Sequence, residues 1–392
     1  LAAGASGPGA DAAHADAGLA RRLREALARL SEEEDEGALR QRAQLLARLA
    51  LDRSWSDPDE ARSLAAEAAR VAGLAAPAPA GPPAPAGPPA PAGPPAPAGT
   101  DAAAAEDLPL RHAARIALAQ LGARREPAAT PDRLTLADAL VARARAEGDR
   151  AVESAARLQR LPLLGELGRA QAVADELERL DELGAALGDE RTLRIAGDVA
   201  TVRELIAGRP LPPRPPRPGW CEVRVAMAQG GLAPLLGEVD DLVRLQPALD
   251  GPRALSALVR LLAGDVREAT DRLTRWQPPE LARLGRAEGY QLHLWSVLGL
   301  VAARIGAREH AEALHGLLEP FADRHAVAPT TAYLTPVARV LGELDGALGR
   351  PQESRERLRL AVVAAEAIGA GAVADAMRRE LGLYAQPTRD RL

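Results

Sequence analysis

Apolar residues recur at intervals of three and four positions along most of this 392-residue chain. Two clear stripes of this kind are Leu39, Ala43, Leu46, Leu49 and Ala50, and Leu167, Ala170, Val173, Ala174, Leu177 and Leu180. The spacing is the period of an amphipathic α-helix, whereas the alternation that is typical of a half-buried strand is scarce. The pattern therefore predicts helices joined by short turns, which is an all-α fold.

Helix starts are marked in several places. Ser31 followed by Glu34 predicts a capping box, and the run Asp57–Glu60 supplies a cap and a first-turn proline. Thr130–Pro131 and Thr335–Pro336 repeat the same arrangement of a cap followed by proline. We expect a helix to begin at each of these four positions.

Two proline-rich segments interrupt the helical pattern. Residues 75–99 repeat the hexamer PPAPAG and hold 11 of the 33 prolines, so we expect an extended linker without a core. Residues 210–218 (PLPPRPPRP) predict a stiff connector between helical blocks, with a docking peptide for an aromatic-lined groove as the less favoured alternative. The expected domains are an N-terminal helical block 1–74, a linker 75–105, helical repeats 106–208, a connector 209–219, further repeats 220–384 and a tail 385–392.

Five glycines share a downstream pattern, with a small or aliphatic residue five positions on in most cases and mainly apolar residues nine and twelve positions on. They are Gly168, Gly230, Gly264, Gly306 and Gly349. Glycine permits a tight turn between two antiparallel helices, and a small residue lets the second helix approach the first. At the fourth corner we expect Gly299, in the helix before the turn, to face Ala311 in the helix after it.

This corner resembles the tetratricopeptide repeat, a helix-turn-helix unit of about 34 residues. Successive corners lie 62, 34, 42 and 43 residues apart, so one interval has that length and the others need longer helices or loops. Each such unit leaves an apolar face that only its neighbour covers. The resemblance implies antiparallel helix pairs stacked into a right-handed superhelix.

Two longer segments resemble a more particular family. Residues 45–72 (LLARLALDRSWSDPDEARSLAAEAARVA) and residues 295–384, which begin WSVLGLVAARIGAREHAEALHGLLEPFADRHAV, are similar to the helical-repeat region of large bacterial AAA/STAND ATPase regulators. These include the LuxR-type and cyclase-linked proteins of high-GC bacteria. The resemblance implies a sensor or partner-docking arm, and we expect the chain, which begins at Leu1, to be part of a longer polypeptide.

In this family a P-loop ATPase core precedes the repeats and a DNA-reading helix-turn-helix may follow them, and the resemblance does not extend to either module. No GxxxxGK[ST] motif occurs, and none could, because all 49 basic side chains are Arg. No signature of a DNA-reading helix-turn-helix follows the repeats, since the residues after Tyr384 read AQPTRDRL.

The composition excludes several fold classes and functions. The aromatic share of 2% nearly excludes an all-β fold, and the absence of Lys and Asn excludes a Schiff-base lysine and a catalytic Asn. The net charge of −5 argues against direct nucleic-acid contact. No apolar run approaches the ~20 residues of a membrane-spanning helix, and a single Cys fits a reducing compartment. We expect a cytoplasmic protein without a membrane partner.

Candidate metal and catalytic residues form no convincing set. His310 and His315 are five residues apart, about 140° around a helix, whereas a zinc-binding helix uses residues four apart. Nothing near Cys221 would activate its thiolate, and the pair Asp240–Asp241 is typical of a solvated helix face. We therefore expect no metal site, no cofactor and no enzyme activity.

One polar strip remains as a candidate binding site. In a tetratricopeptide-like stack the first helix of each pair lines the concave groove. With Trp295 as a packing position, the groove-lining candidates are His293, Ser296, Arg304, Arg339, Glu343 and Tyr290. These side chains would contact a peptide or a small effector, and the alternative is an ordinary solvated face.

The favoured hypothesis is a non-enzymatic scaffold that acts as the sensor or protein-docking arm of a bacterial signal-responsive transcriptional regulator. Its partner would be a protein or peptide, with a small effector as the alternative, and the chain could also self-associate. A free-standing adaptor protein is the second hypothesis. A helical enzyme is the third, and it is disfavoured because four Trp, three Tyr and one Phe are too few to line a cation-stabilising pocket.

Overall fold

The computed structural model describes most of the chain outside the proline tract. The described residues are 17–30, 36–53, 58–71, 126–211, 221, 232, 235–247, 249–285, 290–328 and 333–382. The expected features that lie outside them are the caps at Ser31 and Asp57, the linker 75–105, residues 106–125, most of the connector 209–219, the corner at Gly230 and the tail 385–392.

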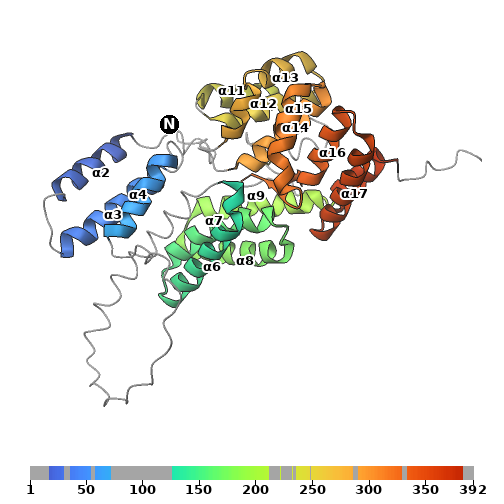
Figure 1. Cartoon of the computed structure of the whole chain (residues 1–392). Helices are drawn as coiled ribbons and strands as arrows, with labels where there is room; N and C mark the ends of the chain where they lie inside the picture. Colours follow the sequence, from blue (N-terminus) through green and yellow to red (C-terminus); the bar gives the residue numbers. More distant parts are fainter. Residues whose placement is uncertain are drawn as a thin grey trace, which may run out of the picture.

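Helices make up nearly all the regular structure of the described residues, which confirms a predominantly helical fold (Figure 1). The first group contains α2 (Ala17–Arg29), α3 (Glu36–Arg53) and α4 (Pro58–Val71). Its core is small, because α3 and α4 meet mainly through buried alanines with Leu46 among them. In Figure 1 this blue group lies to one side of the other helices, and Arg62 of α4 pairs with Glu126.

The second group is a run of helices of similar length. It contains the short η2 (Pro127–Ala129), then α6 (Thr130–Ala146), α7 (Arg150–Glu166), α8 (Ala170–Leu187) and α9 (Glu190–Ile206). Each helix packs on the next one in sequence. The glycines that end these four helices recur every 20 residues, at Gly148, Gly168, Gly188 and Gly208, and all have a positive φ between 63° and 79°.

The corner at Gly188 shows why the chain reverses so abruptly. The left-handed backbone of this glycine (φ 63°) lets the next N–H, that of Asp189, donate to the carbonyl of Gly184 at 2.9 Å. This bond satisfies a carbonyl that the end of α8 leaves without a helical partner. The side chain of Asp189 then accepts from the N–H of Thr192 and starts α9. One helix therefore ends and the next begins within two residues.

The same backbone bond, from the residue after the glycine to the carbonyl five residues earlier, recurs along the chain. It measures 2.8–3.0 Å and starts from the N–H groups of Asp149, Arg169, Arg209, Asp265, Ala307, Arg350 and Ala370. The predicted corners at Gly168, Gly264, Gly306 and Gly349 are confirmed, with φ between 67° and 88°.

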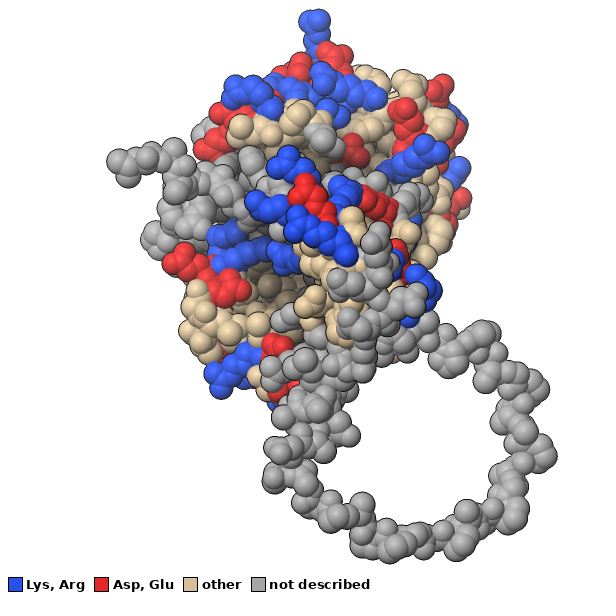
Figure 2. Space-filling model, turned by 90° about the vertical axis from the view of Figure 1, so that its left-hand side faces the viewer, with Lys and Arg blue, Asp and Glu red and all other residues tan. Residues whose placement is uncertain are grey.

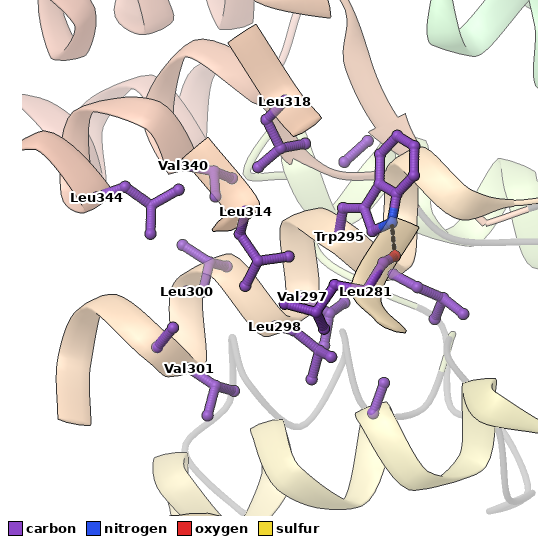
Figure 3. Packing of buried hydrophobic residues seen from close by; sticks show 14 of the residues in the cluster. Leu281, Trp295, Val297, Leu298, Leu300, Val301, Leu314, Leu318, Val340 and Leu344 are labelled. Carbon is purple, nitrogen blue, oxygen red and sulfur yellow. Dashed lines mark hydrogen bonds between the residues drawn. The ribbon is translucent and has the colours of Figure 1, made fainter. Parts of the chain in front are cut away.

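The third group holds the largest core. It contains α11 (Leu235–Leu245), α12 (Asp250–Leu262), α13 (Val266–Leu273), η3 (Pro278–Arg283), α14 (Gln291–Ile305), α15 (Arg308–Leu318), η4 (Glu319–Phe321), β1 (His325–Val327), β2 (Tyr333–Pro336), α16 (Val337–Ala347), α17 (Pro351–Ala367) and α18 (Gly371–Glu380). Helix α14 contacts both α12 and α16, so alternate helices lie side by side while α13, α15 and α17 flank them. Figure 3 shows the leucines and valines that α14 places against α15 and α16.

Trp295 is a packing position, as predicted. Its side chain is 6% exposed, and its indole Nε1 donates to the carbonyl of Leu281 at 2.7 Å (Figure 3). The bond fixes η3 against α14 and leaves the apolar ring surface for the core.

A two-stranded hairpin departs from the expectation of helices alone. Strands β1 and β2 pair antiparallel, with His325 opposite Pro336. β1 contacts α7 and α14, and β2 contacts α16 and α17, so the hairpin joins the second group of helices to the third. The expected helix start, with Thr335 as cap and Pro336 as first residue, is wrong by one residue, because both residues belong to β2, Pro336 is the cap and α16 begins at Val337.

The expected cap at Thr130 also needs correction. Helix α6 begins at Thr130 itself, and the hydroxyl of this residue donates to the carboxylate of Glu166 instead of accepting from the first turn of the helix. The threonine thus ties α6 to the end of α7.

The expectation that Gly299 faces Ala311 needs correction, because Ala311 is not among its three nearest neighbours, although both residues are fully enclosed. A Cβ built on Gly299 would lie 2.6 Å from Val340 Cγ1 and 3.5 Å from Leu344 Cδ1, both in α16, and 3.5 Å from Leu318 Cδ1 in α15. The glycine therefore makes its tightest approach to α16, the next alternate helix, and it also borders its hairpin partner α15.

We predict that Gly299→Leu lowers the free energy of unfolding by about 1–3 kcal/mol or more, because the new side chain must displace Val340. The matched control is Gly316→Leu in α15, where a Cβ would meet nothing within 4 Å and the variant should be at least as stable as the parent. Urea unfolding measures both. Equal effects of the two substitutions would refute this packing of α14 on α16.

Candidate functional site

Three of the expected groove residues meet in an ion-pair ladder, which consists of Arg304, Glu343, Arg339 and Glu380. Arg304 Nε lies 3.1 Å from Glu343 Oε2, and Arg339 Nε lies 3.2 Å from the other oxygen of that carboxylate. Arg339 Nη2 then donates to Glu380 at 2.7 Å. The ladder crosses α14, α16 and α18, and its side chains are 15–43% exposed.

The other three expected groove residues lie elsewhere. His293 and Ser296 are 1% and 0% exposed, and the hydroxyl of Ser296 donates to the carbonyl of Leu292 within its own helix. Tyr290 is half-buried at the N-terminal end of α14, with its ring 6.1 Å from that of His293. These three side chains therefore belong to the inner side of α14, and the structure does not bring them to the ladder.

A partly buried polar cluster ties the second group of helices to the hairpin, and nothing in the sequence pattern indicates it. Glu166 Oε1 accepts from Thr130 Oγ1 at 2.8 Å and from Arg324 Nη1 at 3.1 Å. Burial raises the pKa of Glu166, and the bond from Thr130 and the charges of Arg324 and Arg133 offset only part of that rise. Burial likewise lowers the pKa of Arg133. Charged groups in such a place are costly unless paired, so this cluster fixes one geometry.

A second buried ion cluster connects α7 and α8. Glu153 accepts from Arg157 at 2.9 Å and from both ends of the Arg179 guanidinium at 3.0 and 3.1 Å. Glu176 accepts from Arg157 at 2.9 Å and from Arg160 at 2.5 Å. Burial alone would raise the pKa of Glu153, yet the bonds from Arg179 and Arg157 hold it below its ordinary value. The cluster is structural, since its carboxylates are 1–3% exposed.

The β-hairpin places one histidine against the corner of α7 and α8. His325 is 4% exposed, and its Nδ1 lies 3.4 Å from the hydroxyl of Tyr333. A Cβ on Gly168 would lie 2.7 Å from His325 Nε2, so this corner needs glycine for space as well as for its positive φ. Burial lowers the pKa of His325 to about 4.

An apolar pocket of about 70 Å³ lies beside this histidine, between α7, α8, α9 and the hairpin. Its lining residues are Leu161, Pro162, Gly165, Gly168, Arg169, Ala170, Val173, Val199, Val202, Arg203, Ile206, Val327, Ala328, Tyr333 and Ile368. Two arginines and no acidic residue are among them. The sequence carries no signal for this pocket, because its residues come from segments that are far apart in the chain.

The residues weighed for metal binding or nucleophilic chemistry occupy separate places. His310 is buried and its Nε2 lies 2.9 Å from the carbonyl of Trp276, whereas His315 lies 3.0 Å from the carboxylate of Asp345. Cys221 is buried beside the backbone of Asp198. Within the described ranges, no group of three or more His, Cys, Asp or Glu side chains could hold a metal ion.

On the face drawn in Figure 2, charged side chains of both signs lie among uncharged ones. Arg side chains gather near the middle of the body, with Asp and Glu among them. Among the helices that the structure describes, none is both long and apolar enough to cross a bilayer.

No protein-family model matches the chain, and no curated protein matches it significantly.

We predict that His325 makes stability fall as the pH is lowered from about 6.5 to 4. In that range the unfolded chain takes up a proton on this histidine while the folded chain does not. Because the unfolded state binds more protons, lowering the pH stabilises it relative to the folded state. The full difference is about 3 kcal/mol at most. Urea unfolding between pH 7 and 4.5 should show a flatter pH profile for His325→Leu than for the parent. Parallel profiles would mean that His325 does not titrate as described.

Proposed function

We propose that the chain is a non-enzymatic, tetratricopeptide-like scaffold whose helix pairs stack into a right-handed superhelix and dock a protein or peptide partner. The side-by-side placement of α12, α14 and α16, with α13, α15 and α17 flanking them, supports this stacking. A solenoid of this kind exposes one face of its alternate helices as a continuous binding surface.

The ion-pair ladder is the observation that carries the proposal. In this ladder, side chains of three alternate helices, α14, α16 and α18, come together at the surface. At the two ends of the ladder, Arg304 and Glu380 are 35% and 43% exposed. Exposed ion pairs contribute only about 0–1 kcal/mol each, so a partner can exchange the contacts of these two side chains for its own charges at little cost. The cluster around Glu153 and Glu176 could not be exchanged in this way, because removing one partner would leave a buried charge.

The ladder alternates in sign, with two guanidinium groups and two carboxylates. Arg is well suited to recognise carboxylates because its planar fork donates two parallel hydrogen bonds. We infer a partner segment that itself carries both signs, so that its acids meet Arg304 and Arg339 while its bases meet Glu343 and Glu380.

The larger protein proposed for this scaffold is a bacterial signal-responsive regulator, in which this arm would work in the cytoplasm as a sensor or docking platform. That part of the proposal rests on the resemblance of residues 45–72 and 295–384 to the repeat region of AAA/STAND regulators. Partner binding would be passed on as a change in superhelical curvature. A free-standing adaptor is the second candidate, and it would use the same ladder.

We predict that peptides selected from a displayed random library on the full chain bind through the ladder. Glu343→Arg should weaken the affinity for a selected peptide at least tenfold. The substitution removes the carboxylate that Arg304 and Arg339 share, and with it a carboxylate that the basic side chains of the partner would bind. The matched control reverses a charge in the exposed pair Arg308–Glu312 of α15, as Glu312→Arg, and should leave affinity unchanged. Calorimetry measures both. A library that yields no binder, or binders weakened only by Glu312→Arg, would contradict the proposal.

A further inference from the structure

The pocket beside the hairpin has the features of a small-molecule site. Its walls are the side chains of Leu161, Val173, Val202, Ile206 and Val327, which come from three helices and a strand. Holding one water needs only about 10–15 Å³, so a pocket of about 70 Å³ accepts a group of several heavy atoms. An apolar lining with a few polar groups at its edge is the usual make-up of a ligand pocket.

Arg169 stands at this pocket where related corners of the chain carry a capping residue. The helices before and after α8 begin after Asp149 and Asp189, whose carboxylates accept from the first turns of α7 and α9. Helix α8 begins after Arg169, and no side chain caps it. Of the three corners before α7, α8 and α9, the one before α8 lines the pocket, and it is the one that lacks a side-chain cap.

Arg169 also differs from the other arginines that follow a corner glycine. Arg209 pairs with Glu204 and Arg350 pairs with Asp345, in both cases an acid five residues earlier. The residue five positions before Arg169 is Leu164, which is buried in the core. No carboxylate of the described residues pairs with the side chain of Arg169.

Arg203 of α9 supplies a second positive charge to the same pocket. Its side chain is half-buried among the lining residues, and the carboxylate of the adjacent Glu204 accepts its hydrogen bonds from Arg209. Two arginines are therefore among the residues that line an apolar space, and no acidic residue is among them. A ligand that fits both features has an apolar body and an anionic head.

We propose that this pocket binds a small carboxylic acid, with its apolar chain between α7, α8 and the hairpin and its carboxylate held by Arg169 and Arg203. The site is separate from the ladder on α14, α16 and α18, so the proposal does not depend on the docking of a partner there. The bound acid would contact both the second group of helices and, through Tyr333 and Ile368, the third. It would thereby stabilise their junction, because a ligand that binds only the folded state raises stability by mass action.

The experiment uses the full chain with three probes, hexanoate, octanoate and benzoate, and with 1-octanol as the uncharged counterpart of octanoate. Calorimetry and thermal unfolding should show one saturable site for at least one of the anions, with a dose-dependent rise in melting temperature. Octanol should bind at least tenfold more weakly than octanoate if octanoate is the best probe.

Variants separate this pocket from other apolar surfaces. Arg169→Met and Arg203→Met keep the side-chain length but remove the charge, and each should weaken the best anion about tenfold. The control Arg191→Met lies on the first turn of α9, away from the pocket lining, and should leave affinity unchanged. The proposal is overturned if none of the three anions saturates a site, if the neutral alcohol binds as well as the acid, or if the two pocket variants bind like the parent.

Discussion

The left-handed glycine at most of the described helix corners is the constraint on which the rest of this structure depends. A residue with a Cβ pays about 1–2 kcal/mol to adopt this backbone conformation, whereas glycine adopts it freely. The corner lets the following N–H bond back to the last turn of the helix, and the next helix starts at once. Because the linking segments are so short, consecutive helices must lie against each other. The small residues and leucines on the facing sides of two such helices are buried as a result of this contact.

Clusters of charged side chains have two different roles in the folded chain. The cluster around Glu153 and Glu176 is buried, and it holds α7 and α8 in one relative position because an unpaired charge there would be expensive. The ladder reaches the surface at its two ends, Arg304 and Glu380, where ion pairs can exchange partners at little cost. The proposed docking face and the fixed contact of α7 with α8 are therefore built from the same residue types, and exposure decides which role each serves.

The helix corners could be predicted from the sequence where the residues five, nine and twelve positions after the glycine are mainly apolar. At Gly264 the residues five, nine and twelve positions on are Ala269, Leu273 and Trp276, and all three are buried. The corner at Gly148 was missed for a physical reason. The equivalent positions hold charged residues, which look solvated in the sequence but take part in the buried ion cluster of α7 and α8.

The candidate sites were harder to predict. Arg304, Arg339 and Glu343 follow from the helical register, but His293 and Ser296 do not reach the surface because α14 is packed on several sides. The hairpin was missed because strands of three and four residues leave almost no periodic signal. Without the hairpin, neither the burial of His325 nor the pocket beside it can be inferred, since both need segments from distant parts of the chain.

The most direct measurement compares one substitution at two glycines that both face open space. Gly188 ends α8 with φ 63°, and Gly197 lies within α9, and a Cβ at either would meet nothing within 4 Å. Gly188→Ala should lower the free energy of unfolding by about 1 kcal/mol, because alanine resists the left-handed backbone. Gly197→Ala should raise it by about 0.5–1 kcal/mol, because alanine favours the helix. If urea unfolding shows Gly188→Ala to be as stable as Gly197→Ala, the corner glycines do not determine this fold.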